Sequence, residues 1–69
     1  MTRTWIYQSK DNPEIGLIIE ETKANFSVWI DNYEGGEAYI TDLDFLNDFE
    51  SYEDAYDWIV ENYGEIVEL

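Results

Sequence analysis

Apolar residues recur at every second position in two segments of the first half of the chain, Glu14–Thr22 and Phe26–Asp31. A period of two places such residues on one face of a β-strand. The pattern therefore predicts two strands whose apolar faces belong to the same core. The residues of these faces are Ile15, Leu17, Ile19, Phe26, Val28 and Ile30.

Two further strands are expected on either side of this pair. Thr4–Ser9 is rich in residues that favour strands, and Ala38–Leu43 is a short fourth segment. The connections are short: Lys10–Pro13 has turn chemistry, and Gly35-Gly36 is a hairpin signal because glycine accepts positive φ. Short connections between successive strands favour an antiparallel meander.

After Ser51 the period changes to that of a helix. Apolar and aromatic residues follow the spacing i, i+3, i+4, i+7, i+8, i+11, which predicts one amphipathic helix. Ser51 suits the N-cap, Asp54 stands at the capping-box position, and Gly64 suits the C-terminal cap. We expect a short helical turn over Asp44–Phe49, and either a fifth strand or a tail over Glu65–Leu69. The helical stripe consists of Tyr52, Ala55, Tyr56, Ile59, Val60 and Tyr63.

These elements predict one α+β domain spanning residues 1–69. It is a small antiparallel sheet of three to four strands with one C-terminal helix packed on one face. With 17% aromatic and 45% hydrophobic residues, the 69-residue chain lies outside the disordered class, in which high charge accompanies few aromatics. A domain of this size has a marginal core, so dimerisation is a second route to stability.

The charge is distributed unevenly along the chain. From Ala24 to Leu69 there are thirteen acids and no lysine, arginine or histidine, whereas the first 23 residues carry a net charge of −1. The total is −14. Self-repulsion on this scale weakens the compact state. Solubility alone does not require the removal of every positive charge, so we expect a dedicated basic partner.

The acids of the predicted helix and of the segment before it are the candidate partner-binding residues. Glu53, Asp57 and Glu61 are spaced four apart, which puts them on the helix face opposite the tyrosine stripe. Carboxylates about one turn apart imitate phosphates, of which duplex DNA presents about one per 1.7 Å of axis. The candidate set is Asp42, Asp44, Asp48, Glu50, Glu53, Asp54, Asp57 and Glu61, with Trp29 and Tyr33 as aromatic anchors.

The aromatic residues outside the predicted core suggest an alternative. Trp29, Tyr33 and either Trp5 or Tyr39 fall on strand positions away from the Ile-Val-Phe face, and Trp58 stands beside the helical stripe. Aromatic residues dominate protein interfaces. The chain is then a small structural or regulatory module that forms a homodimer, with acids that serve solubility alone.

Several kinds of chemistry have no basis in the sequence. The chain lacks histidine and cysteine, which excludes thiol catalysis, histidine-based triads and Cys/His zinc sites. Three basic residues do not support direct binding to nucleic acid or to an anionic membrane. We expect no cofactor and no dedicated metal; weak divalent binding by Asp42, Asp44 and Asp48 is the remaining alternative. No apolar run approaches the roughly 18 residues of a membrane span, and Met1–Lys10 has no apolar segment typical of a signal peptide. Together with the lack of cysteine, this predicts a cytoplasmic protein.

In its short length, acidity and aromatic content, the chain resembles the small inhibitors that phages and mobile elements encode against restriction, CRISPR or DNA-repair enzymes. Several of those inhibitors mimic DNA. The resemblance covers composition and expected architecture, and it implies no functional residue. It favours a non-enzymatic protein that imitates DNA or RNA phosphates and inhibits a basic, nucleic-acid-binding enzyme.

Overall fold

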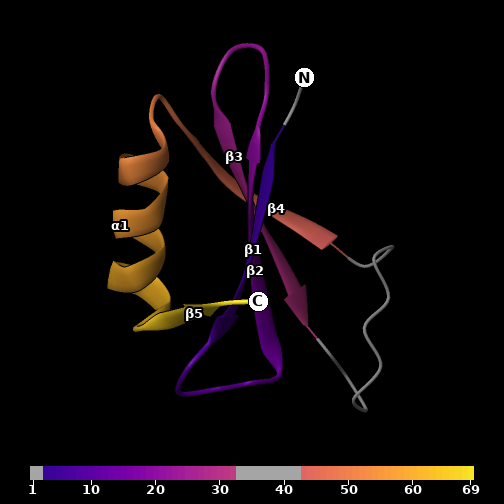
Figure 1. The fold of residues 1–69 in the computed structure, drawn as a ribbon, viewed down its shortest axis with the longest axis vertical. Helices are drawn as coiled ribbons and strands as arrows, with labels where there is room; N and C mark the ends of the chain where they lie inside the picture. Colours follow the sequence, from indigo (N-terminus) through magenta and orange to yellow (C-terminus); the bar gives the residue numbers. More distant parts are fainter. Residues whose placement is uncertain (1–2, 33–42) are drawn as a thin grey trace.

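The computed structural model describes residues 3–32 and 43–69. Their strands make one antiparallel sheet in the order β4-β3-β2-β1-β5, and the helix lies against one face of it (Figure 1). The predicted α+β class with one C-terminal helix is confirmed, although the sheet has five strands rather than three or four. The elements are β1 (Thr4–Ser9), β2 (Ile15–Glu21), β3 (Phe26–Asn32), β4 (Leu43–Phe49), α1 (Tyr52–Tyr63) and β5 (Ile66–Glu68).

The first four strands form the predicted meander, since each pairs with the strand before it in the sequence. The chain then crosses one face of the sheet as α1 and adds β5 to the free edge of β1. Two backbone hydrogen bonds extend this last pairing, from Lys10 N–H to the Glu65 carbonyl (2.9 Å) and from Leu69 N–H to the Ile6 carbonyl (3.0 Å). Of the two expectations for the C-terminus, the strand is therefore confirmed.

The core lies between α1 and the face of the sheet that the period of two predicted. Cross-strand partners such as Leu17 and Ile30, or Ile19 and Val28, point to the same face. Burial of these large aliphatic residues supplies the main stabilising term, at about 25 cal/mol per Å² of apolar surface. The buried apolar residues are Tyr7, Leu17, Ile19, Val28, Ile30, Ala55 and Ile59.

The helical turn predicted over Asp44–Phe49 is wrong, because this segment is strand β4. Its pairing with β3 shifts by one residue: Val28 lies opposite Asn47, but Trp29 lies opposite Phe45. Leu46 is the extra residue of this β-bulge, which disrupts strand alternation in the sequence and so hides the strand. Apart from Leu43, the strand predicted over Ala38–Leu43 lies outside the described residues, as does the Gly35-Gly36 turn.

Both predicted caps of α1 are confirmed. The Ser51 side chain accepts a hydrogen bond from the Asp54 N–H (3.1 Å), which satisfies one of the free donors at the helix start. At the other end, Gly64 has φ of 81° and its N–H donates to the Val60 carbonyl (2.9 Å). A positive φ favours glycine at this position, because any other side chain is strained there.

Trp5, which was one of two alternatives for an aromatic residue outside the core, and Trp58, which was placed beside the helical stripe, both pack against the core. Trp5 pairs with Ile19 and therefore faces the helix, where its ring centroid lies 4.8 Å from that of Tyr52. Trp58, which belongs to α1, packs against Phe49 of β4, and their ring centroids are 5.6 Å apart. The two faces of β1 are similar in composition, so the sequence left the position of Trp5 open.

Tyr7 links the sheet to the helix by a hydrogen bond between its hydroxyl group and that of Tyr52. Only 4% of the Tyr7 surface is exposed. Burial, with the Tyr52 hydrogen bond as the next contribution, raises the pKa of Tyr7 well above its ordinary value. The neutral phenol is thus part of the folded state.

This environment predicts a stability that depends on alkaline pH. Since the pKa of Tyr7 is higher in the folded state, its contribution is fully present below pH about 10 and is lost as pH rises further. Above that pH, wild type should lose up to about 1.4 kcal/mol of unfolding free energy per pH unit more than Tyr7→Phe. At neutral pH, the substitution itself should cost about 1 kcal/mol.

Chemical denaturation at a series of pH values measures both effects. Tyr63→Phe is the control, because Tyr63 lies outside this hydrogen bond, and it should keep the wild-type slope. Parallel slopes for Tyr7→Phe and wild type would contradict the role given to the Tyr7 hydroxyl.

Candidate functional site

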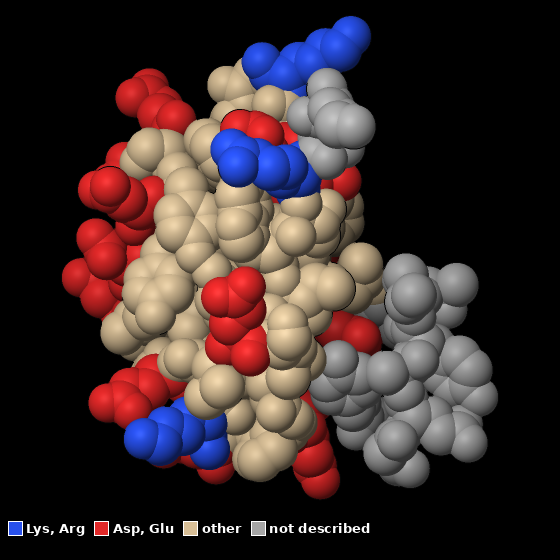
Figure 2. Space-filling model, in the orientation of Figure 1, with Lys and Arg blue, Asp and Glu red and all other residues tan. Residues whose placement is uncertain are grey.

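Four carboxylates form an acidic face on α1: Glu53, Asp54, Asp57 and Glu61. All four side chains are exposed. The helix buries Ala55 and Ile59 against the sheet, so residues on the other side of the helix point outward. Figure 2 shows carboxylates along the outer edge of the molecule over α1, and lysine and arginine side chains toward the top and the bottom of the molecule. The predicted exposure of these acids is confirmed, but Glu53 and Asp57 line one hollow together with Tyr52 and Tyr56 and so flank the tyrosine stripe rather than lie opposite it.

The acidic face is partly favourable and partly costly to the helix. Glu53 and Asp54 stand in the first turn, where the helix dipole favours negative charge. The last turn contains no basic residue, so Glu61 stands near the negative end without compensation. Asp57 also repels Glu53 and Glu61, at a few tenths of a kcal/mol for each pair. Folding alone gives no reason for this arrangement.

Neither ion pair in the described part of the chain involves a carboxylate of the acidic face. Arg3 Nε is 3.4 Å from Glu21 Oε1, and Lys10 Nζ is 3.1 Å from Glu65 Oε2. Arg3 also stands over the Trp5 ring, 5.2 Å from its centroid. Neither pair neutralises a carboxylate of α1, so the acidic face presents its negative charge to solvent.

A shallow hollow of about 360 Å³ adjoins the acidic face. It is lined by Tyr52, Glu53, Tyr56 and Asp57. The two tyrosine rings have centroids 6.1 Å apart and belong to the aromatic layer that packs against Trp5 and Tyr7. Aromatic faces and carboxylates both attract a cationic side chain, the first through cation–π attraction and the second through charge. The hollow therefore has the chemistry to accept lysine or arginine.

The other predicted acids do not join this face as one surface. Asp44, Asp48 and Glu50 are exposed, on β4 and just after it. Asp44 pairs with Ile30 on the helix side, whereas Asp48 pairs with Ser27 and accepts a hydrogen bond from its hydroxyl (2.7 Å). The bulge at Leu46 thus turns these two acids to opposite faces of the sheet.

Asp42 and Tyr33 lie outside the described residues. Within residues 3–32 and 43–69, no group of three or more acids is placed to hold a metal ion. Asp44 and Asp48 lie on opposite faces of the sheet, so these two carboxylates do not bind the same divalent cation.

Trp29 lies on the side of the sheet opposite the acidic face. It pairs with Ile18 and Phe45, and its ring centroid is 5.4 Å from that of Phe45. A partner surface that binds the acids of α1 does not contact Trp29, because the sheet lies between them. We call this side the helix-free face; its described apolar residues are Ile6, Ile18, Trp29, Leu43, Phe45 and Val67.

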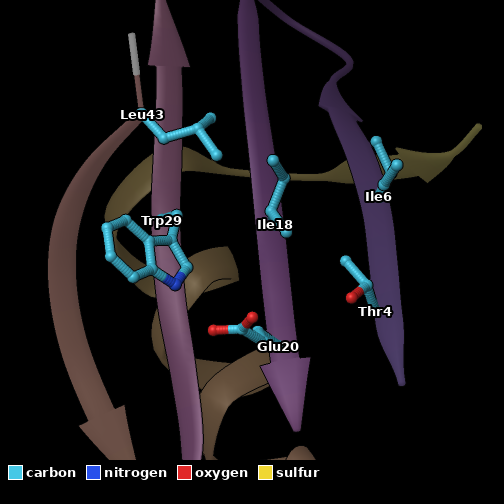
Figure 3. A pocket seen from close by; sticks show the side chains of 6 residues that line it. All are labelled: Thr4, Ile6, Ile18, Glu20, Trp29 and Leu43. Carbon is cyan, nitrogen blue, oxygen red and sulfur yellow. The ribbon is translucent and has the colours of Figure 1, made fainter. Parts of the chain in front are cut away.

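The helix-free face contains a second hollow, of about 300 Å³, at its centre (Figure 3). The sequence analysis identified only Trp29 among its residues. A signal was present in β2, where Leu17, Ile18 and Ile19 are consecutive: an unbroken apolar run is typical of a strand covered on both faces. The lining residues are Thr4, Ile6, Ile18, Glu20, Trp29 and Leu43.

Comparisons with protein-family models, with curated proteins and with solved structures found no match for this chain. Within the described ranges, no helix has the length and apolar content needed to cross a membrane. The two faces of the molecule are therefore the basis for any functional proposal.

The electrostatics of α1 predict that Glu61→Lys stabilises the isolated protein. The substitution removes a repulsion with Asp57, replaces it with an attraction, and puts a cation at the negative end of the helix dipole. The free energy of unfolding should rise by about 1 kcal/mol at low ionic strength, and the gain should shrink with added salt.

Glu14→Lys is the control, since Glu14 is exposed, lies in the turn between β1 and β2, and changes the net charge equally. Thermal or urea unfolding of both variants separates the local effect from the global one. Equal stabilisation of both variants at low salt would show that the gain comes from the lower net charge and not from the position of Glu61 on the helix.

Proposed function

We propose that this protein is a non-enzymatic inhibitor that presents carboxylates to a basic surface which otherwise holds DNA or RNA. Its partner is a nucleic-acid-binding enzyme such as a nuclease or a restriction, CRISPR or repair enzyme. The observation that carries the proposal is the acidic face of α1, whose carboxylates are exposed and take part in neither of the described ion pairs.

The rigidity of α1 supports this proposal. Its stripe is anchored in the core through Ala55 and Ile59, and both of its ends are capped. Carboxylates four residues apart on such a helix stand about 6 Å apart along the axis. A regular row of fixed charges offers a basic groove the complementarity that accelerates association and selects basic partners.

The hollow beside Tyr52 and Tyr56 adds specificity to the charge. A row of carboxylates attracts any basic surface, whereas an arginine that enters the hollow would also contact aromatic rings and two flanking acids. Such a residue would be held at one position on α1, which fixes the register between inhibitor and enzyme. The proposed contact residues are therefore Tyr52 and Tyr56 together with Glu53, Asp54, Asp57 and Glu61.

A pair of matched double variants tests the proposal. Asp57→Lys/Glu61→Lys reverses two charges on the acidic face, and Glu14→Lys/Glu68→Lys reverses two exposed charges elsewhere. Each pair changes the net charge from −14 to −10. Immobilised wild type and both variants are exposed to a bacterial lysate, and the bound proteins are eluted with a salt gradient or with duplex DNA.

We expect wild type and Glu14→Lys/Glu68→Lys to retain the same DNA-binding enzyme, released by moderate salt and displaced by DNA. Asp57→Lys/Glu61→Lys should lose it, because two attractions become repulsions; the expected loss is about 100-fold or more in affinity, or about 3 kcal/mol. Equal retention by the two double variants, or retention that duplex DNA does not reduce, would show that α1 is not a phosphate mimic.

A further inference from the structure

The exposed apolar residues of the described chain gather on one side of the molecule. Ile6, Phe45 and Val67 are 46%, 51% and 49% exposed, and their strand pairing places all three on the helix-free face. Leu69, 66% exposed, continues the alternation of Val67 beside Ile6. A contiguous apolar surface of this kind marks an interaction site rather than a scatter of single residues.

We infer that the helix-free face binds a second copy of this chain, so that two sheets stack face to face in a two-fold symmetric dimer. An isologous interface requires that one surface be complementary to itself. The helix-free face has a hollow between Ile18, Trp29 and Leu43 (Figure 3). The ring of Phe45, which is 51% exposed, lies beside Trp29. A hollow and a projection on one face are the two parts that a rotated copy needs.

The placement of charge makes a second copy possible despite the net charge of −14. Stacked sheets lie about 10 Å apart, and each helix adds about 10 Å on the outer side, so the two α1 axes would be separated by about 30 Å. This is about three Debye lengths at 0.1 M salt, which leaves little repulsion between the two acidic faces.

Acids on the helix-free face oppose the approach of a second copy, and salt screens this repulsion. The charged residues of the face within the described strands are Glu20, Asp31 and Asp48, and Lys10 and Glu65 form an ion pair at the end of the β1–β5 pairing. Asp31 is 6% exposed, and Asp48 accepts the hydrogen bond from Ser27. A foreign basic partner is drawn instead to α1, where the exposed carboxylates are concentrated. The helix-free face therefore suits a mainly apolar surface, which the second copy supplies.

The size of the face indicates a weak dimer. Four strands about 20 Å long and the shorter β5, about 4.8 Å apart, give a footprint of about 400 Å². The accessible area of a corrugated face is somewhat larger. A standard interface buries about 800 Å² per partner. We therefore expect association at micromolar concentrations, with a dissociation constant on the order of 10–100 μM.

Sedimentation equilibrium of the full chain over a range of concentrations tests the dimer. Ile6→Lys/Phe45→Lys places two charges in the proposed interface, and Asn47→Lys/Asn62→Lys adds the same charge at exposed positions on the helix side. The first variant should weaken dimerisation by about tenfold or more. The second should leave it unchanged or strengthen it, because it lowers the repulsion between copies. Circular dichroism checks that both variants fold.

Salt separates this inference from the proposed function. Added salt should strengthen the dimer, since it screens the repulsion between two acidic copies, but it should weaken binding to a basic enzyme. A monomer at concentrations up to about 1 mM, far above the expected dissociation constant, would overturn the inference. So would equal dimerisation by Ile6→Lys/Phe45→Lys and wild type. Neither result bears on the acidic face, which is tested through Asp57 and Glu61.

Discussion

The packing of α1 against one face of the sheet is the interaction on which the rest of the molecule depends. Ala55 and Ile59 are fully buried against Leu17, Ile19 and Val28, so the helix and the meander are stabilised by a single core. This one contact fixes two surfaces at once. The outer side of the helix must be polar, and the opposite side of the sheet is left without a covering element among the described residues.

One of these two surfaces is strongly acidic and the other is largely apolar, and a two-layer fold requires neither. The outer side of α1 carries carboxylates, with no basic residue in the last turn of the helix. The other side gathers Ile6, Phe45 and Val67. Each arrangement weakens the isolated monomer, the first through repulsion and the second through exposed apolar surface. A domain with a marginal core has little stability to lose, so both destabilising surfaces are explained if each one binds a partner. The two proposals assign a basic enzyme to the first and a second copy to the other, and they are compatible because the sheet separates the two surfaces.

Much of the fold could be predicted because its signals are local. The alternation of Ile15, Leu17 and Ile19 defines β2, and the helical stripe with Ser51 and Gly64 defines α1 and both of its ends. The acidic face was equally accessible, since the spacing of Glu53, Asp57 and Glu61 on a helix places them together. By contrast, the helix predicted over Asp44–Phe49 was wrong. The Leu46 bulge is stabilised by pairing with β3, and this non-local contact decides the conformation of the segment.

The amino-acid sequence by itself determined the α+β class, the buried face of β2 and β3, the limits of α1 and the excess of negative charge, because each follows from periodicity or composition within one segment. Only the tertiary structure decided that Trp5 packs under the helix, that Asp44 and Asp48 point to opposite faces, and that β5 completes the sheet beside β1. These outcomes depend on the register between strands distant in sequence, where a shift of one residue moves a side chain to the opposite face. The helix-free face is a property of that register.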